Sequence, residues 1–564
     1  MAKRLLECVP NFSEGRDMSI IKQITDVVEA VEGVKLLDVD PGKATNRTVV
    51  TFVGEPEAVA EAAFQAVKKA AELIDMSKHH GEHPRMGATD VVPFVPIAGI
   101  TMEETVEIAR SVAKRIGEEL GIPTYCYENA AFTEERRNLA NVRAGEYEAL
   151  PKKLVDPHWK PDFGPAEFND HIAKTGATAV SARNFLVAYN VNLNTTSTRR
   201  ANAIAFDVRE AGRVKREGNP ITGKKVLDEN GNPVRIPGTL RKVKAIGWYI
   251  EEYGIAQISM NLTDIDVTPM HIAFDEVVEK ARLRGVRVTG SELVGLVPLK
   301  AMLDAGKYFL RKQKRSVGVP EEELIKIAVK SLGLDDLKPF NPKEKIIEYL
   351  LEDDNDAPLV KMNLREFANE TSMESPAPGG GSISAYIGAL GVSLGTMVAN
   401  LSSHKRGWDD RWEFFSDWAE KGQKYKDELL HLVDEDTNAF NKIMEAYKLP
   451  KGTDEEKAAR KKAIEEATKY AISVPLRVME VSYNSMQVMR AMAEHGMSAS
   501  ISDVGVGAMA ALTAVRGAYL NVRINAKDLD DQEYKDKVLS QAAEIERKAT
   551  ELEAEIMKLV EEKL

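Results

Sequence analysis

The sequence predicts an α/β plus all-α protein in which two tandem ferredoxin-like βαββαβ subdomains are followed by a C-terminal helical bundle. Between residues 4 and 294 the hydrophobic pattern runs strand, helix, strand, strand, helix, strand, and this order occurs twice. From about Leu359 the pattern is nearly all helical. At 564 residues the chain is also too long for a single core. The expected ranges are 1–183 for the first subdomain, 184–330 for the second, 331–358 for an acidic linker and 359–564 for the bundle.

The two repeats consist of short alternating strands and amphipathic helices. In the first, strands are expected at 4–10, 34–40, 47–54 and 90–97, and helices at 17–31 and 55–74, with a further helix near 102–120. In the second, strands are expected at 185–193, 244–250, 256–262 and 286–294, and helices from about Ser197 and at 269–285. Two related sheets that meet leave a cleft, which is the usual place for a ligand.

An insert interrupts the second repeat at residues 213–240. Within it, VLDENGNPVRI predicts a hairpin, because Asn230 and Gly231 suit a tight turn between two strands. The sequence assigns no role to this insert.

The last third of the chain predicts four long helices, at 410–448, 453–494, 498–525 and 531–562. Before them, residues 382–403 carry no charge and are long enough to cross a bilayer. Their neighbours are charged helices, and the glycines within the segment allow close helix packing. We therefore expect a buried bundle helix here and no membrane span.

Composition narrows the class of protein. The formal net charge of −12, from 76 Lys and Arg against 88 Asp and Glu, argues against non-specific binding to nucleic acid. Cys8 and Cys126 are the two cysteines, too few for a disulfide framework or a four-thiolate zinc site within one chain. The N-terminal segment lacks a long apolar run, so a secretory signal is not expected. These features predict a cytoplasmic protein.

Three of the nine histidines lie within five residues, in the segment HHGEH. His79, Glu82 and His83 match the H-x-x-E-H pattern of inverted zinc peptidases, which requires a helix. Gly81 and Pro84 favour a loop instead. A metal-free site with one histidine as acid or base is therefore favoured over zinc, and a solvated polar turn is the other alternative.

Two further segments of the first subdomain could line a ligand site. Asp38 and Asp40 alternate onto one face of a strand, where they could orient an imidazole or a substrate, or only solvate the strand end. Between the repeats, Trp159, Phe163 and Phe168 could stack on a flat ligand, although rigid packing explains the same aromatic residues equally well.

The helical region begins with a glycine-rich turn. Gly379, Gly380 and Gly381 directly precede Ser382 at the expected start of a helix. Such a turn suits close backbone approach and anion binding at a helix N-terminus, and a tight interhelical turn is the alternative.

A carboxylate interrupts an apolar stripe further along the helical region. At helical spacing Asp436 shares one stripe with Leu429, Leu432, Val433, Phe440 and Ile443, whereas Asp434 and Glu435 lie off it. Burial should raise the pKa of such a carboxyl group, which suits proton transfer near neutrality. A paired structural aspartate is the alternative.

Eight segments together resemble a known family. They are ECVPNFSEG, LLDVDPGKATNRTV, DMSKHHGEHPRMGATDVVPFVPI, RAGEYEALPKKL, PDFGPAEF, GSELVGLVPLKAML, PAPGGGS and LVDEDTNAF. The set is similar to the formimidoyltransferase-cyclodeaminases, the bifunctional folate enzymes of histidine breakdown, and it spans nearly the whole chain. The 213–240 insert departs from the family pattern.

For the first half, the resemblance implies a formimidoyltransferase that moves the formimidoyl group of N-formimidoyl-L-glutamate to N5 of tetrahydrofolate. Residues 1–183 and 184–330 would be its N-terminal and C-terminal subdomains. The family's transferase histidine corresponds to His83, and the aspartate beside it to Asp40. The folate-contacting stretch corresponds to Gly164, Pro165, Phe168 and Gly176.

For residues 359–564, the resemblance implies a cyclodeaminase that closes 5-formimidoyltetrahydrofolate to 5,10-methenyltetrahydrofolate and releases ammonia. Its acid/base residue corresponds to Asp436, and its loop to Gly379, Gly380, Gly381 and Ser382. Tetrahydrofolate, polyglutamylated, would be the co-substrate, and the chemistry needs no metal. The implied partner is a second copy of the chain through the helical domain, with no nucleic acid and no membrane.

Three alternative functions remain open from the sequence. A transferase of purine fermentation would take formimidoylglycine as the donor and need only a smaller pocket. A zinc hydrolase would use His79 and His83. A non-catalytic folate-binding scaffold would keep the cleft without turnover.

Overall fold

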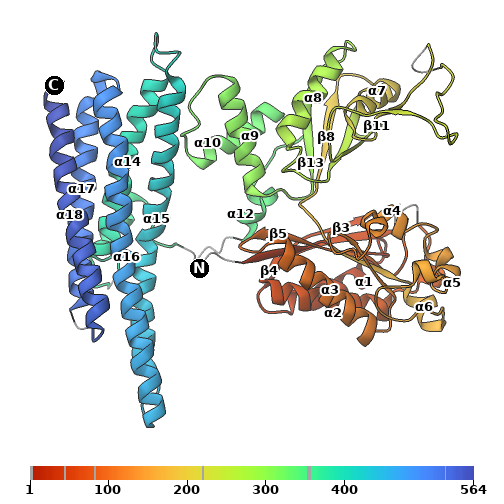
Figure 1. Ribbon diagram of the computed structural model, residues 1–564, viewed down its shortest axis with the longest axis horizontal. Coiled ribbons are helices and arrows are strands. Elements are labelled where there is room, and N and C mark those ends of the chain that lie inside the picture. The colour runs from red at the N-terminus through yellow and green to blue at the C-terminus, as the bar shows by residue number, and fades with distance from the viewer. Residues whose placement is uncertain are drawn as a thin grey trace. The chain divides into compact units, whose positions relative to one another are not determined.

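The computed structural model describes residues 4–42, 46–81, 84–218, 222–351, 357–375, 377–527 and 529–564. Its internal contacts divide the chain into two compact units (Figure 1). The sheet unit comprises residues 1–301 and 332–351, and the helical unit comprises residues 302–331 and 352–564.

The first sheet of the sheet unit has seven strands. They are β1 (Leu5–Cys8), β2 (Asn11–Phe12), β3 (Val34–Gly42), β4 (Arg47–Gly54), β5 (Thr89–Ala98), β6 (Thr124–Glu128) and β7 (Thr178–Ala182). Strand β4 pairs antiparallel with β3 on one side and with β1 and β2 on the other. Strand β5 pairs antiparallel with β1 and β2, and parallel with β7, which in turn pairs parallel with β6.

Three helices cover one face of this sheet: α1 (Met18–Glu29), α2 (Pro56–Leu73) and α3 (Met102–Glu119) (Figure 1). Their apolar stripes join the alternate strand residues Phe52, Val92 and Phe94 in one buried cluster. Strands β1, β3, β4 and β5 and the three helices lie where the two hydrophobic periods predict them, whereas β2, β6 and β7 were not predicted.

The opposite face of the first sheet is covered by a series of short helices. They are η2 (Glu134–Arg137), α4 (Leu139–Val142), η3 (Tyr147–Ala149), α5 (Leu150–Lys153), η4 (Pro157–Trp159) and α6 (Asp170–Thr175). They pack on the other set of alternate residues, among them Val91, Tyr125 and Ala179. At β5, β6 and β7 the sheet is therefore buried on both faces.

The second sheet has four antiparallel strands in the order β11 (Val243–Ile250), β12 (Ile255–Leu262), β8 (Val187–Leu193) and β13 (Val288–Val294). Helices α7 (Thr198–Val208) and α8 (Met270–Arg282) accompany it. Strand β9 (Arg213–Val214) pairs antiparallel with β10 (Arg235–Ile236), and within the insert the predicted hairpin is present, with Leu227 bridged antiparallel to Pro233. Its turn includes Gly231, whose φ of +80° suits glycine.

The helical unit is built around long helices that run side by side (Figure 1). They are α14 (Gly380–Ser403), α15 (Trp412–Lys448), α16 (Asp454–His495), α17 (Ile501–Ala526) and α18 (Gln532–Glu561). The short helices α10 (Glu321–Leu332) and α13 (Leu364–Thr371) precede them, and α9 (Leu299–Lys312) crosses the boundary between the units. The long helices begin and end within a few residues of the predicted limits.

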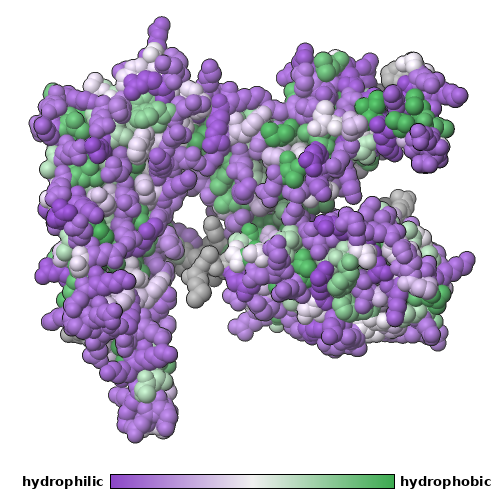
Figure 2. All heavy atoms as spheres, in the orientation of Figure 1, coloured by the Kyte–Doolittle hydropathy of each residue, from purple (hydrophilic) through white to green (hydrophobic). Residues whose placement is uncertain are grey.

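Helix α14 and residues 498–526 are long and apolar enough to cross a membrane, but more than half of each apolar stretch is buried inside the unit. A methyl group at Gly391 would lie 2.8 Å from the Gly507 carbonyl oxygen, so α14 and α17 approach closely at these glycines. Polar and charged residues cover most of the visible face of the helical unit (Figure 2).

The predicted linker at 331–358 has a different structure from the one expected. Residues up to 351 pack within the sheet unit, where α11 (Pro342–Lys345) and α12 (Ile347–Leu351) form. Half-buried Glu348 accepts a hydrogen bond from the Leu299 N–H at 2.7 Å, which anchors this segment within the sheet unit. The helical unit also includes residues 302–331, most of which were expected in the second subdomain, 184–330.

Candidate functional site

Asn46 organises the loop that carries the histidines. Its side-chain amide donates to the His80 carbonyl oxygen at 3.0 Å, and its side-chain oxygen accepts the Gly15 N–H at 3.0 Å. Its own carbonyl oxygen lies 2.9 Å from Nε2 of His79. Asn46 has a positive φ of +47°, a conformation that asparagine adopts more readily than most residues. It thereby joins three segments that are distant in the sequence.

His79 is buried in this loop, and both of its ring nitrogens are engaged. Nε2 donates to the Asn46 carbonyl oxygen, which leaves Nδ1 to accept the Arg85 Nε–H at 3.4 Å. Burial lowers the pKa of His79, and the nearby Arg85 guanidinium acts in the same direction. His79 is therefore a neutral positioning residue without a free nitrogen for zinc. Glu82 and His83 lie outside the described residues.

Arg85 connects the histidine loop to the RAGEYEAL segment. Its guanidinium binds Glu148 through two nitrogens, at 2.7 and 2.9 Å, and Glu146 at 3.1 Å. The Tyr147 N–H also donates to the Arg85 carbonyl oxygen at 2.9 Å. Such charge-assisted contacts hold the loop on its C-terminal side, just as Asn46 holds it on the other.

A buried aspartate follows this loop at the start of β5. Asp90 accepts the Met86 N–H at 2.9 Å and the Arg143 Nη2–H at 2.6 Å. Burial raises the pKa of Asp90, and the Arg143 guanidinium opposes that shift. This pair was not predicted from the sequence, although a carboxylate at the start of an apolar strand was a detectable signal.

The predicted Asp40 belongs to the same electrostatic network. It is exposed on β3, two residues from half-buried Asp38. Burial lowers the pKa of Arg47, and the negative charges of Asp90 and Asp40 both act to raise it, against this larger effect of burial. Burial raises the pKa of Asp38, and the negative charge of Asp40 adds to that rise. The two aspartates share one face of the strand, as the alternation predicted.

Of the predicted folate residues, Gly176 lies directly against the histidine segment. It forms an antiparallel bridge with Gly87, and a Cβ at Gly176, where φ is +67°, would overlap the Met86 carbonyl oxygen. Phe168 packs against the apolar cluster that includes Met86. These two positions are thus close to the segment that carries His83.

The other predicted folate residues lie elsewhere on the sheet unit. Gly164, with φ +87°, packs on Gly117 of α3 and on the Ile122 carbonyl oxygen, and Pro165 follows it as a half-buried residue. Phe163 stacks edge-on against Phe132. Close packing therefore accounts for part of the aromatic segment that suggested ligand stacking.

The second candidate site lies in the helical unit, where Asp436 of α15 meets the first turn of α14. Oδ2 of Asp436 accepts the Ser382 N–H at 3.0 Å and the Ser382 hydroxyl at 3.3 Å. Burial raises the pKa of Asp436, and the hydrogen bonds from Ser382 oppose the shift without reversing it. The result is a mostly buried carboxyl group at a helix N-terminus, suited to giving and taking a proton.

The glycine turn lets the carboxylate approach this closely. A Cβ at Gly381 would overlap the Asp436 carboxylate, whereas one at Gly380 would meet only the Asn521 side chain at 3.4 Å. Gly379 is the N-cap residue of α14. Of the four predicted loop positions, Gly381 and Ser382 therefore lie against the predicted acid/base, and Gly379 and Gly380 directly precede them.

The predicted apolar stripe was wrong at Phe440, and Asp434, which was placed off the stripe, is buried on another face of α15. Asp434 is only 5% exposed and accepts the backbone N–H groups of Leu359 and Val360, at 2.8 and 3.2 Å. Phe440, placed on the stripe, is 43% exposed. Helix α15 contacts both α14 and α16, so more than one of its faces is buried and a single stripe does not describe it.

Family models match almost all of the chain. Residues 5–183 match the formiminotransferase domain, N-terminal subdomain, and residues 188–352 match the formiminotransferase domain. Residues 363–544 match formiminotransferase-cyclodeaminase. The formimidoyltransferase-cyclodeaminase of Gallus gallus is 45% identical over 564 residues, covering 100% of both chains. The chain belongs to the formimidoyltransferase-cyclodeaminase family.

Within this formimidoyltransferase-cyclodeaminase, the two candidate sites have separate relatives. The glutamate formimidoyltransferase of Streptococcus pyogenes serotype M1 is 44% identical over 311 residues, which is 55% of this chain and 94% of that one. The methenyltetrahydrofolate cyclohydrolase of Methylorubrum extorquens is 35% identical over 201 residues, which is 36% of this chain and 97% of that one. Each half of the formimidoyltransferase-cyclodeaminase thus resembles a protein that exists alone.

Proposed function

We propose that this chain is a bifunctional folate enzyme of histidine degradation. The sheet unit transfers the formimidoyl group of N-formimidoyl-L-glutamate to N5 of tetrahydrofolate, and the helical unit converts 5-formimidoyltetrahydrofolate to 5,10-methenyltetrahydrofolate and ammonia. The observation that carries the proposal is the contact of Asp436 with Ser382, because it joins the two motifs of the cyclodeaminase at one buried carboxyl group.

In the transfer step, His83 takes the proton from N5 as this nitrogen attacks the formimidoyl carbon. The carbon–nitrogen bond to glutamate then breaks, and His83 returns the proton to the leaving nitrogen. Asp40 and the Arg47–Asp90 network supply the charges around the histidine loop. Support comes from the anchoring of that loop by Asn46 and Arg85.

In the second step, N10 of the folate attacks the same carbon and closes the five-membered ring. The exocyclic imine nitrogen needs two protons to leave as ammonia. Asp436 passes it the proton that N10 loses on attack and a second proton taken up from solvent, and the bond from this nitrogen to carbon then breaks. The raised pKa of Asp436 supports this role, because burial favours the protonated form of the carboxyl group that must donate. Tetrahydrofolate, polyglutamylated in the cell, is the shared co-substrate, and neither step requires a metal.

The fold and the assembly complete the proposal. We infer two ferredoxin-like subdomains. Support comes from the order of the strands in space, which is β3-β4-β1-β5 in the core of the first sheet and β11-β12-β8-β13 in the second. If the four strands of each set are numbered along the chain, both orders are 2-3-1-4. We also infer self-association through the helical unit in the cytoplasm. Support comes from exposed apolar residues on α14 and α17, namely Leu390, Met397, Leu401, Val506, Met509 and Leu520.

Ammonia release with each candidate donor tests the function. Purified protein with tetrahydrofolate and formimidoylglutamate should release one ammonia for each 5,10-methenyltetrahydrofolate formed, and formimidoylglycine should give far less. A preference for the glycine donor would replace the substrate assignment. Absence of ammonia with both donors, together with folate binding, would favour the non-catalytic scaffold.

A further inference from the structure

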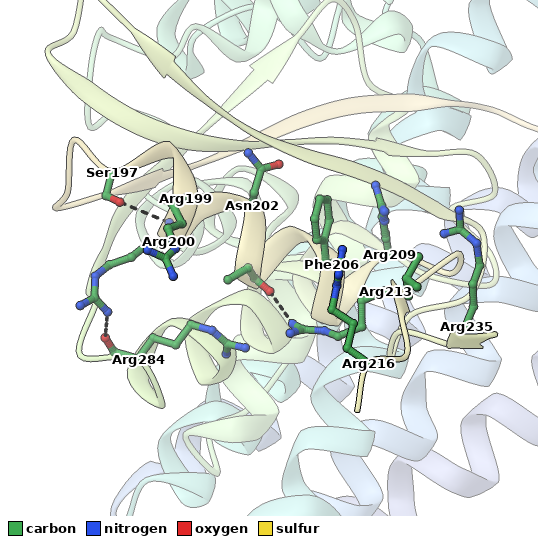
Figure 3. Close-up of a pocket in the computed structure, with 12 residues that line it drawn as sticks. Ser197, Arg199, Arg200, Asn202, Phe206, Arg209, Arg213, Arg216, Arg235 and Arg284 are labelled. Carbon is green, nitrogen blue, oxygen red and sulfur yellow. Dashed lines mark hydrogen bonds between the residues drawn. The ribbon is translucent and has the colours of Figure 1, made fainter. Parts of the chain in front are cut away.

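One cavity of the sheet unit is strongly basic and shares no lining residue with either candidate site. It measures about 930 Å³, and we call it the arginine pocket (Figure 3). Helix α7, the insert and the end of α8 contribute its lining. Its seven arginines are Arg199, Arg200, Arg209, Arg213, Arg216, Arg235 and Arg284.

Few carboxylates balance these arginines. Asp207 forms ion pairs with both Arg213 and Arg284. The other five have no carboxylate partner within the part of the chain that the structure describes. Three of them donate instead to backbone carbonyl oxygens around the insert, Arg209 to Gly212, Arg216 to Gly223 and Arg235 to Ala211.

The positive charges of neighbouring arginines also lower one another's pKa. Burial lowers the pKa of Arg209, and the charge of Arg235 adds to that effect. Burial likewise lowers the pKa of Arg213, with a further contribution from Arg284. Half-buried cations that repel one another create a positive potential that a bound anion would relieve.

The pocket borders the helices that pack on the second sheet. Helix α7 packs on β11, where a Cβ at Gly247 would overlap the backbone of Asn202. On the other face of the same strands, Gln257 donates to Asn192 at 2.8 Å and accepts from Trp248. The arginine pocket thus lies on the helix side of the sheet.

We propose that the arginine pocket binds a small polyanion that carries at least three phosphate or carboxylate groups. Guanidinium forks bind both groups through paired hydrogen bonds, and seven of them around one cavity suit several anionic groups in a row. Arg199 and Arg200 stand at one end of the lining and Arg216 and Arg235 at the other, with Phe206 between them (Figure 3). A single phosphate would leave most of this cavity unfilled.

Isothermal titration calorimetry on the full-length protein tests the site, with inorganic tripolyphosphate and penta-γ-glutamate as separate probes. The variant R199Q/R216Q/R235Q removes three charges that form no ion pair, and it should bind the probe at least about tenfold more weakly. The matched control is Arg282→Gln on α8, because Arg282 already pairs with Glu279 and does not line the pocket. Its affinity should equal that of the unchanged protein.

Each outcome decides the proposal. Tripolyphosphate binding that the triple variant loses supports a phosphate ligand, and penta-γ-glutamate binding that it loses supports a polycarboxylate. Binding of neither probe, or equal binding by the triple variant, overturns the site. Transfer to tetrahydrofolate monoglutamate should be unchanged in the triple variant, so a failure of this proposal is distinct from a failure of the enzyme assignment.

Discussion

Asp436 and Ser382, 54 residues apart, form the contact that joins α15 to the start of α14: one carboxylate oxygen accepts both the backbone N–H and the hydroxyl of the serine. The same hydroxyl lies 2.8 Å from the Val433 carbonyl oxygen, one turn earlier on α15. The carboxyl group is thereby fixed at a helix N-terminus while burial favours its protonated form.

We predict that Asp436→Asn stops ammonia release and leaves formimidoyl transfer intact. Asparagine preserves the shape of the side chain but cannot exchange a proton, so the second step should slow about 10²- to 10⁴-fold. Stopped assays should find 5-formimidoyltetrahydrofolate accumulating. Ammonia release at the unchanged rate would make Asp436 a structural residue.

Gly381→Ala should have nearly the same effect on ammonia release for a steric reason. Its Cβ would overlap the Asp436 carboxylate, so either the carboxylate or the first turn of α14 must move. Gly380→Ala is the matched control, because its Cβ meets only the Asn521 side chain at 3.4 Å. If both alanine variants keep full cyclodeaminase activity, close approach at Gly381 is not needed for catalysis.

We expect His83→Ala to lower the rate of formimidoyl transfer about 10²- to 10⁴-fold, while conversion of supplied 5-formimidoyltetrahydrofolate continues. His79→Gln should retain much more transfer, because a glutamine amide can still donate to the Asn46 carbonyl oxygen. Parallel assays of the two steps measure both effects. Equal loss of transfer in the two variants would argue that His79 shares the acid/base role.

Glu7 should make the stability of the sheet unit depend on pH. Burial raises its pKa to about 7, the Arg183 charge opposes this shift, and Glu348 adds to it. The folded state therefore holds a proton that the unfolded state has released, so this stabilisation is complete at low pH and is lost as the pH rises to about 7. Glu7→Gln should remove that slope, a difference on the order of 3 kcal/mol between pH 5 and pH 8.

Urea unfolding of both proteins at the two pH values, followed by fluorescence of the sheet unit, measures this difference. Taking the difference between variant and unchanged protein removes the contribution of other titrating groups. Parallel pH profiles for the two proteins would show that Glu7 titrates normally.

Periodicity predicted most of the strands and helices because local hydrophobic patterns determine them, and the Asn230–Gly231 turn predicted the hairpin. Contacts between motifs that are distant in the sequence could not be predicted in this way. Asp90 meets Arg143 across 53 residues, and no local pattern encodes such a pair. The burial of Asp434 and the exposure of Phe440 were not predicted. Helix α15 has neighbours on more than one side, which the pattern of one helix cannot reveal.

The insert leaves and rejoins the second sheet at almost one point. A Cβ at Gly212 would overlap the Ile236 carbonyl oxygen, and one at Gly238 would overlap that of Arg209. A chain that runs directly from 212 to 238 could therefore close without stretching the sheet. The insert is thus a separable module of the second sheet, and deleting it would remove Arg213, Arg216 and Arg235 from the arginine pocket together.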